Sequence, residues 1–163
     1  MSSITVRFTL PTGAYFDAEL PKITKLRKNF TLSEVANNLA SERVKFVYDR
    51  SVAEFLDMVQ ELRDKIGSIT VNSCYRTASF NRSCGGSANS LHLRALAMDC
   101  AMPRLTDARY AQVKLLWQTI CAAHGRIGGI NRYTNGVHID GHEEQFGYKG
   151  FVERDYRGKK GDW

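Results

Sequence analysis

The chain has 163 residues, of which 43% are hydrophobic and 25% charged, and its formal net charge is +6. This length suits one domain with a sizeable core, and the composition excludes disordered, collagen-like and coiled-coil proteins. No apolar run reaches the roughly 20 residues that span a bilayer, so we expect no membrane insertion.

The positive charge favours an anionic partner, such as nucleic acid, acidic lipid headgroups or a bacterial cell wall. The basic residues are scattered, with small clusters at 22–28 and 157–160. They do not alternate with aromatic residues, as they do in proteins that stack bases. We therefore expect no nucleic-acid binding.

The first residues and the spacing of the cysteines indicate where the chain is made and whether its thiols are reduced. Residues 1–13 lack the apolar stretch of a signal peptide, so we expect synthesis in the cytoplasm without such a signal. No C-x-x-C pair is present, and reduced thiols are expected for the four cysteines, which are Cys74, Cys84, Cys100 and Cys121.

The first half of the chain predicts two short strands and two helices. Residues 4–20 alternate polar and apolar around a turn at residues 11–13. Thr31 and Glu34 have the spacing of a capping box, which predicts a helix start, and Ser51 with Glu54 repeats it. After Ser51, apolar residues recur at helical spacing as far as Ile66, and Gly67 follows as a C-cap.

The second half predicts a further helix, which begins at Thr106-Asp107 and ends before Gly125. The Ser-, Asn- and Gly-rich stretch 77–90 and the polar tail from Gly141 are expected to be irregular. Four more short strands are predicted, at residues 68–74, 96–101, about 126–130 and 136–140. We therefore expect an α+β fold, a single domain with a small antiparallel sheet and helices packed on it.

Two of the four histidines stand close to an aspartate. His92 precedes Asp99, and His138 precedes Asp140. Imidazole and carboxylate are ligands that zinc accepts, and a catalytic zinc site needs three of them plus an open position for water. The spacing alone, however, fits local hydrogen bonds or a solvated polar cluster better than a metal site.

The surrounding sequence contains a longer, ordered pattern. Its parts are FTLSE at residues 30–34, Ser73-Cys-Tyr75-Arg76, Asn81, Gly85-Gly86, Ser90-Leu-His92, Ala97-Met-Asp99 and Val137-His138-Ile-Asp140. The pattern resembles the zinc D-Ala-D-Ala carboxypeptidase family. That family includes the L-alanyl-D-glutamate endopeptidases of phages and shares its metal site with the hedgehog signalling domain.

The resemblance implies a hedgehog/D-Ala-D-Ala peptidase-like fold and a division of the chain. Residues 1–163 would be one peptidase domain, with its motif-bearing core at 29–141. Residues 1–28 would then be an N-terminal hairpin extension, and residues 142–163 a C-terminal tail.

The resemblance also implies one Zn²⁺ ion, held by His92, Asp99 and His138. Arg76 matches the arginine that stabilises the oxyanion in the family. Ser90 and Tyr75 match positions that we expect to contact the substrate.

We expect Asp140 to be catalytic, as the general base, with an orienting role as the alternative. Residues two apart in a strand face the same side, so Asp140 could join His138 at the site and act as the general base. It could instead orient a ligand histidine from behind. Many relatives place the acid three positions before the last histidine, where this chain has Asn135.

Two other positions depart from the family pattern. Cys74 and Ala95 stand where glycine is expected. Both side chains are small, so a tight backbone would tolerate them unless it requires a positive φ.

The function implied is that of a zinc metallopeptidase that hydrolyses peptide bonds in the stem peptides of bacterial peptidoglycan. The small, basic chain suits a phage endolysin, an endopeptidase that acts on the cell wall after release, and we expect a monomer. A virion-associated enzyme would use the same chemistry. The alternatives are a D,D-carboxypeptidase or dipeptidase, and a non-catalytic zinc-stabilised binding module.

Overall fold

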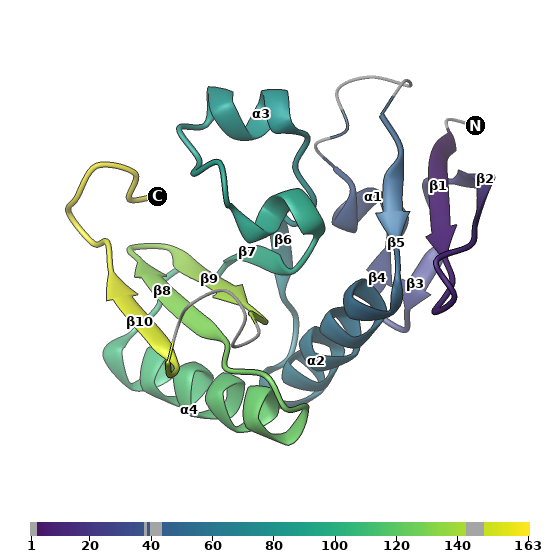
Figure 1. Ribbon diagram of the computed structural model, residues 1–163. Coiled ribbons are helices and arrows are strands. Elements are labelled where there is room, and N and C mark those ends of the chain that lie inside the picture. Colours follow the sequence, from purple (N-terminus) through teal and green to yellow (C-terminus); the bar gives the residue numbers. More distant parts are fainter. Residues whose placement is uncertain (1–2, 38, 40–43, 143–148) are drawn as a thin grey trace.

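The computed structural model describes residues 3–37, 39, 44–142 and 149–163. They form an α+β domain, as the sequence predicts (Figure 1). Its three sheets have the strand orders β2-β1-β5, β10-β8-β9-β7-β6 and β3-β4.

The N-terminal sheet begins with the predicted hairpin. β1 (Ser3–Thr9) and β2 (Tyr15–Pro21) pair antiparallel, and Gly13 in the turn has a φ of 84°, which glycine adopts without strain. β1 also pairs in parallel with β5 (Phe46–Tyr48). The small sheet of β3 (Lys25–Arg27) and β4 (Phe30–Thr31) follows the hairpin.

Both predicted helix starts in the first half correspond to helices. Thr31 and Glu34 form the capping box of α1 (Leu32–Val35), which is only one turn long. In α2 (Arg50–Ile66) the N-cap is Asp49, whose carboxylate accepts a hydrogen bond from Val52 N, so the start predicted at Ser51 is two residues late. Gly67 is the C-cap, with a φ of 88°.

The five-stranded sheet contains the four strands predicted in the second half. They are β6 (Thr70–Ser73), β7 (Ala97–Ala101), β8 (Gly129–Tyr133) and β9 (Gly136–Asp140). β8 begins three residues later than predicted, after Gly128, which has a φ of 68°. The helix predicted at Thr106 is α4 (Asp107–Ala123), with Thr106 as its N-cap.

Two stretches predicted to be irregular contain regular structure. Residues 77–90 contain α3 (Ala78–Ser83), capped by the hydroxyl of Thr77, and the 3-10 helix η1 (Leu91–Arg94) follows directly. The tail contains β10 (Val152–Asp155), while residues 143–148 lie outside the described residues. Because β10 pairs in parallel with β8, the sheet is mixed and not purely antiparallel.

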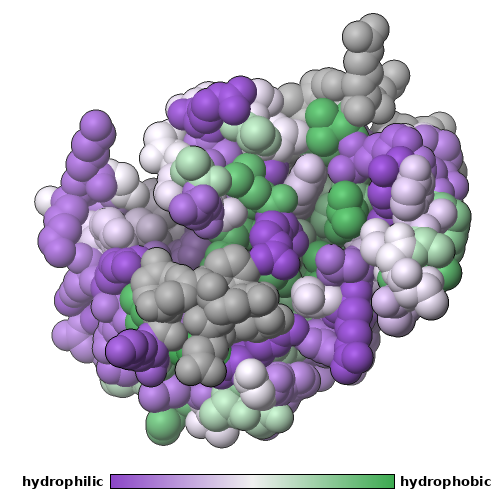
Figure 2. Space-filling model, viewed as in Figure 1, coloured by the Kyte–Doolittle hydropathy of each residue, from purple (hydrophilic) through white to green (hydrophobic). Residues whose placement is uncertain are grey.

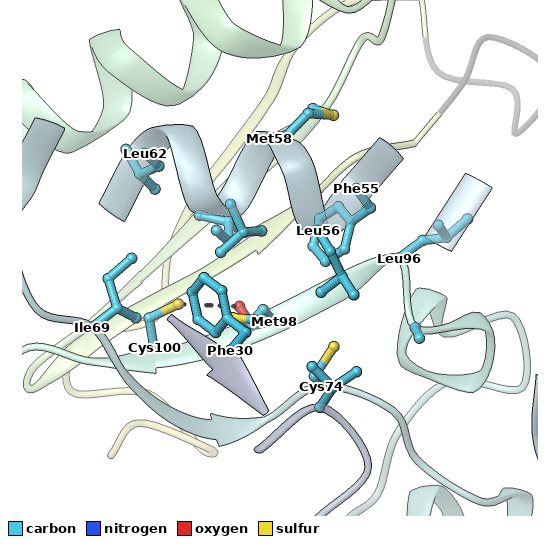
Figure 3. Close-up of a cluster of buried hydrophobic side chains, with 14 of the residues drawn as sticks. Phe30, Phe55, Leu56, Met58, Leu62, Ile69, Cys74, Leu96, Met98 and Cys100 are labelled. Atoms are coloured by element: carbon cyan, nitrogen blue, oxygen red, sulfur yellow. Dashed lines mark hydrogen bonds between the residues drawn. The ribbon is translucent and has the colours of Figure 1, made fainter. Parts of the chain in front are cut away.

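The core lies between the helices and the sheets. Figure 3 shows side chains of α2 meeting Phe30, Met98 and Cys100. Phe55 of α2 contacts Trp117 of α4 edge to face, at 6.0 Å between ring centroids. The indole of Trp117 donates to the backbone carbonyls of Gly129 and Asp140, at 3.0 and 3.1 Å. The helices thereby hold the ends of β8 and β9 in place.

No helix among the described residues is long and apolar enough to cross a membrane. On the face seen in Figure 2, hydrophilic residues predominate and hydrophobic ones are interspersed.

The helix packing predicts a contrast between two leucines. Leu62 of α2 is fully buried, whereas Leu115 of α4 is 65% exposed. We expect Leu62→Ala to lower the free energy of unfolding by about 2–5 kcal/mol, because it leaves a cavity in the core. Leu115→Ala should change it by no more than about 0.5 kcal/mol. Urea denaturation followed by circular dichroism measures both, and equal losses would contradict the assigned core.

Candidate metal centre

The three predicted metal ligands come together from three separate elements. His92 lies in η1, Asp99 in β7 and His138 in β9. Asp99 and His138 are directly opposite each other in the antiparallel pair of β7 and β9, so their side chains stand on the same face of the sheet. Among the described residues, these three form the group of potential ligands whose ligand atoms all lie within 4.8 Å of one another.

The separations of the donor atoms are close to those that a tetrahedral zinc ion requires. His138 Nδ1 and Asp99 Oδ1 are 2.9 Å apart, and His92 Nε2 is 3.2 Å from His138 Nδ1 and 3.3 Å from Asp99 Oδ1. Zinc bonds of about 2.0–2.2 Å at tetrahedral angles place neighbouring ligand atoms about 3.4 Å apart. A small outward movement of the carboxylate therefore suffices to admit the ion.

In both imidazoles, the ring nitrogen that faces away from the three donor atoms contacts an oxygen atom of the protein. His92 is 3% exposed, and its Nδ1 donates to the backbone carbonyl of Cys74 at 2.7 Å, which leaves the lone pair on Nε2 for a metal. On His138 the outward nitrogen is Nε2, which lies 3.5 Å from Asp140 Oδ2. Such partners fix the tautomer and orientation of ligand histidines.

Asp140 therefore contacts His138 on the side opposite to Asp99. Its other oxygen, Oδ1, accepts a hydrogen bond from the buried ring of His142. Of the two roles that the sequence leaves open for Asp140, this position supports the orienting role, because the carboxylate does not lie on the ligand-atom side of His138.

The site's electrostatics favour a bound cation. Burial opposes the charge of Asp99, but hydrogen bonds from His138 and His92 outweigh it and hold the pKa of Asp99 well below its usual value. Burial lowers the pKa of His92, so that ring is neutral at pH 7. Burial also acts to lower the pKa of His138, but hydrogen bonds to Asp140 and Asp99 raise it to about 9. The carboxylates thus draw positive charge to the place where a metal would bind.

Arg76 lies beside the ligands and is anchored at three points. Its Nη2 donates to Asp99 Oδ2, its Nε to Ser73 Oγ at 2.8 Å, and its backbone N–H to the carbonyl of His92 at 2.9 Å. The guanidinium lines the same hollow as the three ligands. Its fixed positive charge therefore lies in the same hollow as the three candidate ligands.

The two residues predicted to contact substrate have different positions. Ser90 lines the hollow, and it also caps η1 by accepting from His92 N at 3.4 Å. Tyr75 packs against Phe46 at 5.4 Å between ring centroids, next to the core. The structure thus brings Ser90 to the ligands but does not place Tyr75 among the described residues that line the hollow.

The hollow around the ligands has a volume of about 550 Å³. A second hollow, of about 870 Å³, lies on the other side of His138 and includes Asp140 and His142. Four residues line both: Ser87, Ser90, Asn131 and His138. The two hollows therefore adjoin each other at His138, and together they offer a longer space than the first hollow alone.

Sequence reasoning missed several residues of the first hollow, which are Asn131, Tyr133, Tyr156, Lys160 and Trp163. Asn131 is the cross-strand partner of His138, so the correct register of the β8-β9 hairpin would have indicated it. The tail residues reach the hollow because β10 pairs with β8, far away in the sequence.

Ala95 occupies a left-handed backbone conformation at the end of η1, with a φ of 54° and a ψ of 33°. This is one of the positions where the family pattern has glycine. A non-glycine residue in this conformation costs about 1–2 kcal/mol. The backbone N–H of Ala95 closes η1 by bonding to the carbonyl of His92 at 3.3 Å. The strained backbone of Ala95 therefore lies directly beside the candidate ligand His92.

Comparison with known proteins agrees with this geometry. The family model described as Peptidase M15 matches residues 28–140, which include all three candidate ligands, Arg76 and Asp140. A comparison with curated protein sequences gives no match. The match over most of the chain confirms the expected family, and the chain therefore belongs to the M15 peptidases, the zinc D-Ala-D-Ala carboxypeptidase family.

Proposed function

We propose that this chain is a zinc endopeptidase of the phage endolysin type, which cuts the stem peptides of bacterial peptidoglycan after its release to the cell wall. The observation that carries the proposal is the triangle of His92, Asp99 and His138 donor atoms, set at zinc-ligand separations. Membership of the M15 family supports peptidoglycan as the substrate.

The donor set fits one zinc ion. Two imidazoles and one carboxylate leave a fourth position open, as in catalytic and not in structural zinc sites. When bound, zinc polarises a carbonyl oxygen and lowers the pKa of water to about 7.

The remaining groups of the hollow would bind and orient the peptide. Arg76 uses two of its donors for Asp99 and Ser73, and a guanidinium has five. It can therefore hold the ligand carboxylate and also offset negative charge that develops on the attacked carbonyl oxygen. Ser90 and Asn131, which line both hollows, offer polar groups to the peptide backbone.

The two hollows favour an endopeptidase over a D,D-carboxypeptidase. Cleavage of an internal bond requires space for several residues on both sides of the metal. The described residues provide about 550 Å³ around the three candidate ligands, and a further hollow of about 870 Å³ adjoins this space at His138. A carboxypeptidase needs to accommodate only one or two residues beyond the bond that it cuts.

A first prediction concerns metal loading. After dialysis against zinc and gel filtration, the parent protein should retain about one ion per chain, measured by elemental mass spectrometry. His92→Ala should retain much less, because it removes one of three ligands. His124→Ala is the matched control, since His124 caps α4 and contacts Glu61 at 3.4 Å, outside the site. Equal loss in both variants would contradict the ligand assignment.

A second prediction concerns activity on the cell wall. Zinc-loaded protein incubated with purified peptidoglycan should release peptide fragments that mass spectrometry identifies, and chelation or His92→Ala should abolish the release. Fragments cut within the stem peptide would support an endopeptidase, whereas loss of a terminal D-Ala alone would indicate a carboxypeptidase. A protein that retains zinc but releases nothing would instead be a zinc-stabilised binding module.

A third prediction separates the two roles of Asp140. If Asp140 orients His138, Asp140→Asn should weaken zinc binding by about 10–100-fold, and excess zinc should restore much of kcat. Asp64→Asn, on the exposed side of α2, is the matched control and should leave both quantities unchanged. If zinc binds Asp140→Asn normally while kcat is lost at every zinc concentration, Asp140 is the general base.

A further inference from the structure

The tail that follows the family match forms one wall of the hollow at the metal ligands. Residues 149–163 lie beyond the matched range 28–140, yet Tyr156, Lys160, Gly161 and Trp163 line the hollow together with His92, Asp99 and His138. In Figure 1 this segment is the yellow strand and loop that run beside β8.

Hydrogen bonds fix the tail to the end of β8 and to the turn between β8 and β9. Beyond β10, Tyr156 N donates to the carbonyl of Arg132 at 2.8 Å, and Asn135 N donates to the carbonyl of Trp163 at 2.8 Å. The carboxylate of Asp162 accepts from both the backbone N–H and the hydroxyl of Thr134, each at 2.6 Å. The tail is therefore anchored on the same hairpin that carries His138.

Stacked aromatic rings stiffen this wall. The ring of Tyr133 lies between those of Tyr156, at 5.4 Å and 12°, and Trp163, at 5.0 Å and 23°. Gly136 provides the room for Trp163, because a Cβ at position 136 would lie 2.5 Å from the indole. Lys160 thus projects from a segment whose position relative to the ligands is defined.

The charge of the hollow favours an anionic substrate group. Asp99 is the one acidic side chain in its described lining; it is a candidate metal ligand and already pairs with Arg76. Lys160 is the second cation of the lining, and in the part of the chain that the structure describes no carboxylate pairs with it. A bound divalent metal would make the hollow still more positive.

We propose that Lys160, held by the anchored tail, binds a carboxylate of the stem peptide next to the bond that is cut, so that the enzyme prefers acidic stem peptides to amidated ones. Lys160 would be a specificity-determining residue and not a catalytic one. This inference rests on the proposed function and names the substrate group that the site selects.

The test uses two substrates that differ in one group. One is the stem pentapeptide L-Ala-D-Glu-L-Lys-D-Ala-D-Ala with a free glutamate α-carboxylate, and the other is its α-carboxamide form. The zinc-loaded parent protein should cleave the carboxylate form with a kcat/KM about three- to tenfold higher, as expected for a partly exposed ion pair. Lys160→Ala should remove the preference mainly by raising KM for the acidic peptide, and Lys160→Glu should reverse it.

Lys159→Ala is the matched control. It removes the same charge from the neighbouring position, but the ammonium of Lys159 is bound to the carbonyl of Asp155 and does not line the hollow. It should keep the preference. Near-ultraviolet circular dichroism of the Tyr133 and Trp163 stack checks that each variant keeps the tail in place, and Lys160→Met replaces Lys160→Ala if it does not.

The outcomes distinguish the two proposals. If the parent cleaves neither peptide nor peptidoglycan, the proposed function fails and the inference fails with it. If the parent cleaves both peptides equally, or if Lys160→Ala keeps the preference, the inference is wrong while the peptidase function stands.

Discussion

The pairing register of β7 and β9 is the constraint on which the whole site depends. It sets Asp99 opposite His138, and it is held by the buried neighbours on each side, Met98 opposite Ile139 and Cys100 opposite Val137. Because side chains alternate between the faces of a sheet, a slip of one residue would turn one ligand toward the core. The hydrophobic core therefore fixes the distance between two candidate metal ligands.

The same core also controls how the ligands point. Trp117 binds the backbone carbonyl of Asp140, whose carboxylate in turn faces the outward nitrogen of His138. In the same way, the outward nitrogen of His92 bonds to the backbone carbonyl of Cys74, which is a buried residue. Since each ligand histidine is oriented by a group rooted in the core, the site is organised before a metal binds, and ordering these side chains does not weaken metal affinity.

The three candidate ligands and most elements could be proposed from sequence because their signals are local. The capping box at Thr31 and the ordered motifs around His92 and His138 are each contained in a few residues. α3 was missed although its cap, Thr77, is a local signal, because the Gly- and Ser-rich composition around it is typical of a loop. β10 carries no comparable signal, since its strand conformation depends on pairing with β8, more than 20 residues earlier in the chain. The position of residues such as Lys160 depends on that pairing, so a local sequence pattern could not predict that they line the hollow.

The residues predicted from sequence and the residues missed would have different tasks in the proposed enzyme. A zinc ion and an arginine act on any peptide carbonyl, so they supply reactivity but little discrimination among bonds. Discrimination needs contacts with the parts of the substrate that do not react. In the proposed enzyme those contacts would come from a wall anchored on Thr134 and Asn135, in the turn that leads into β9 and His138. A substrate group bound by the tail is thereby held at a fixed offset from the metal ligands, which is the geometric requirement for selecting one bond among several similar ones.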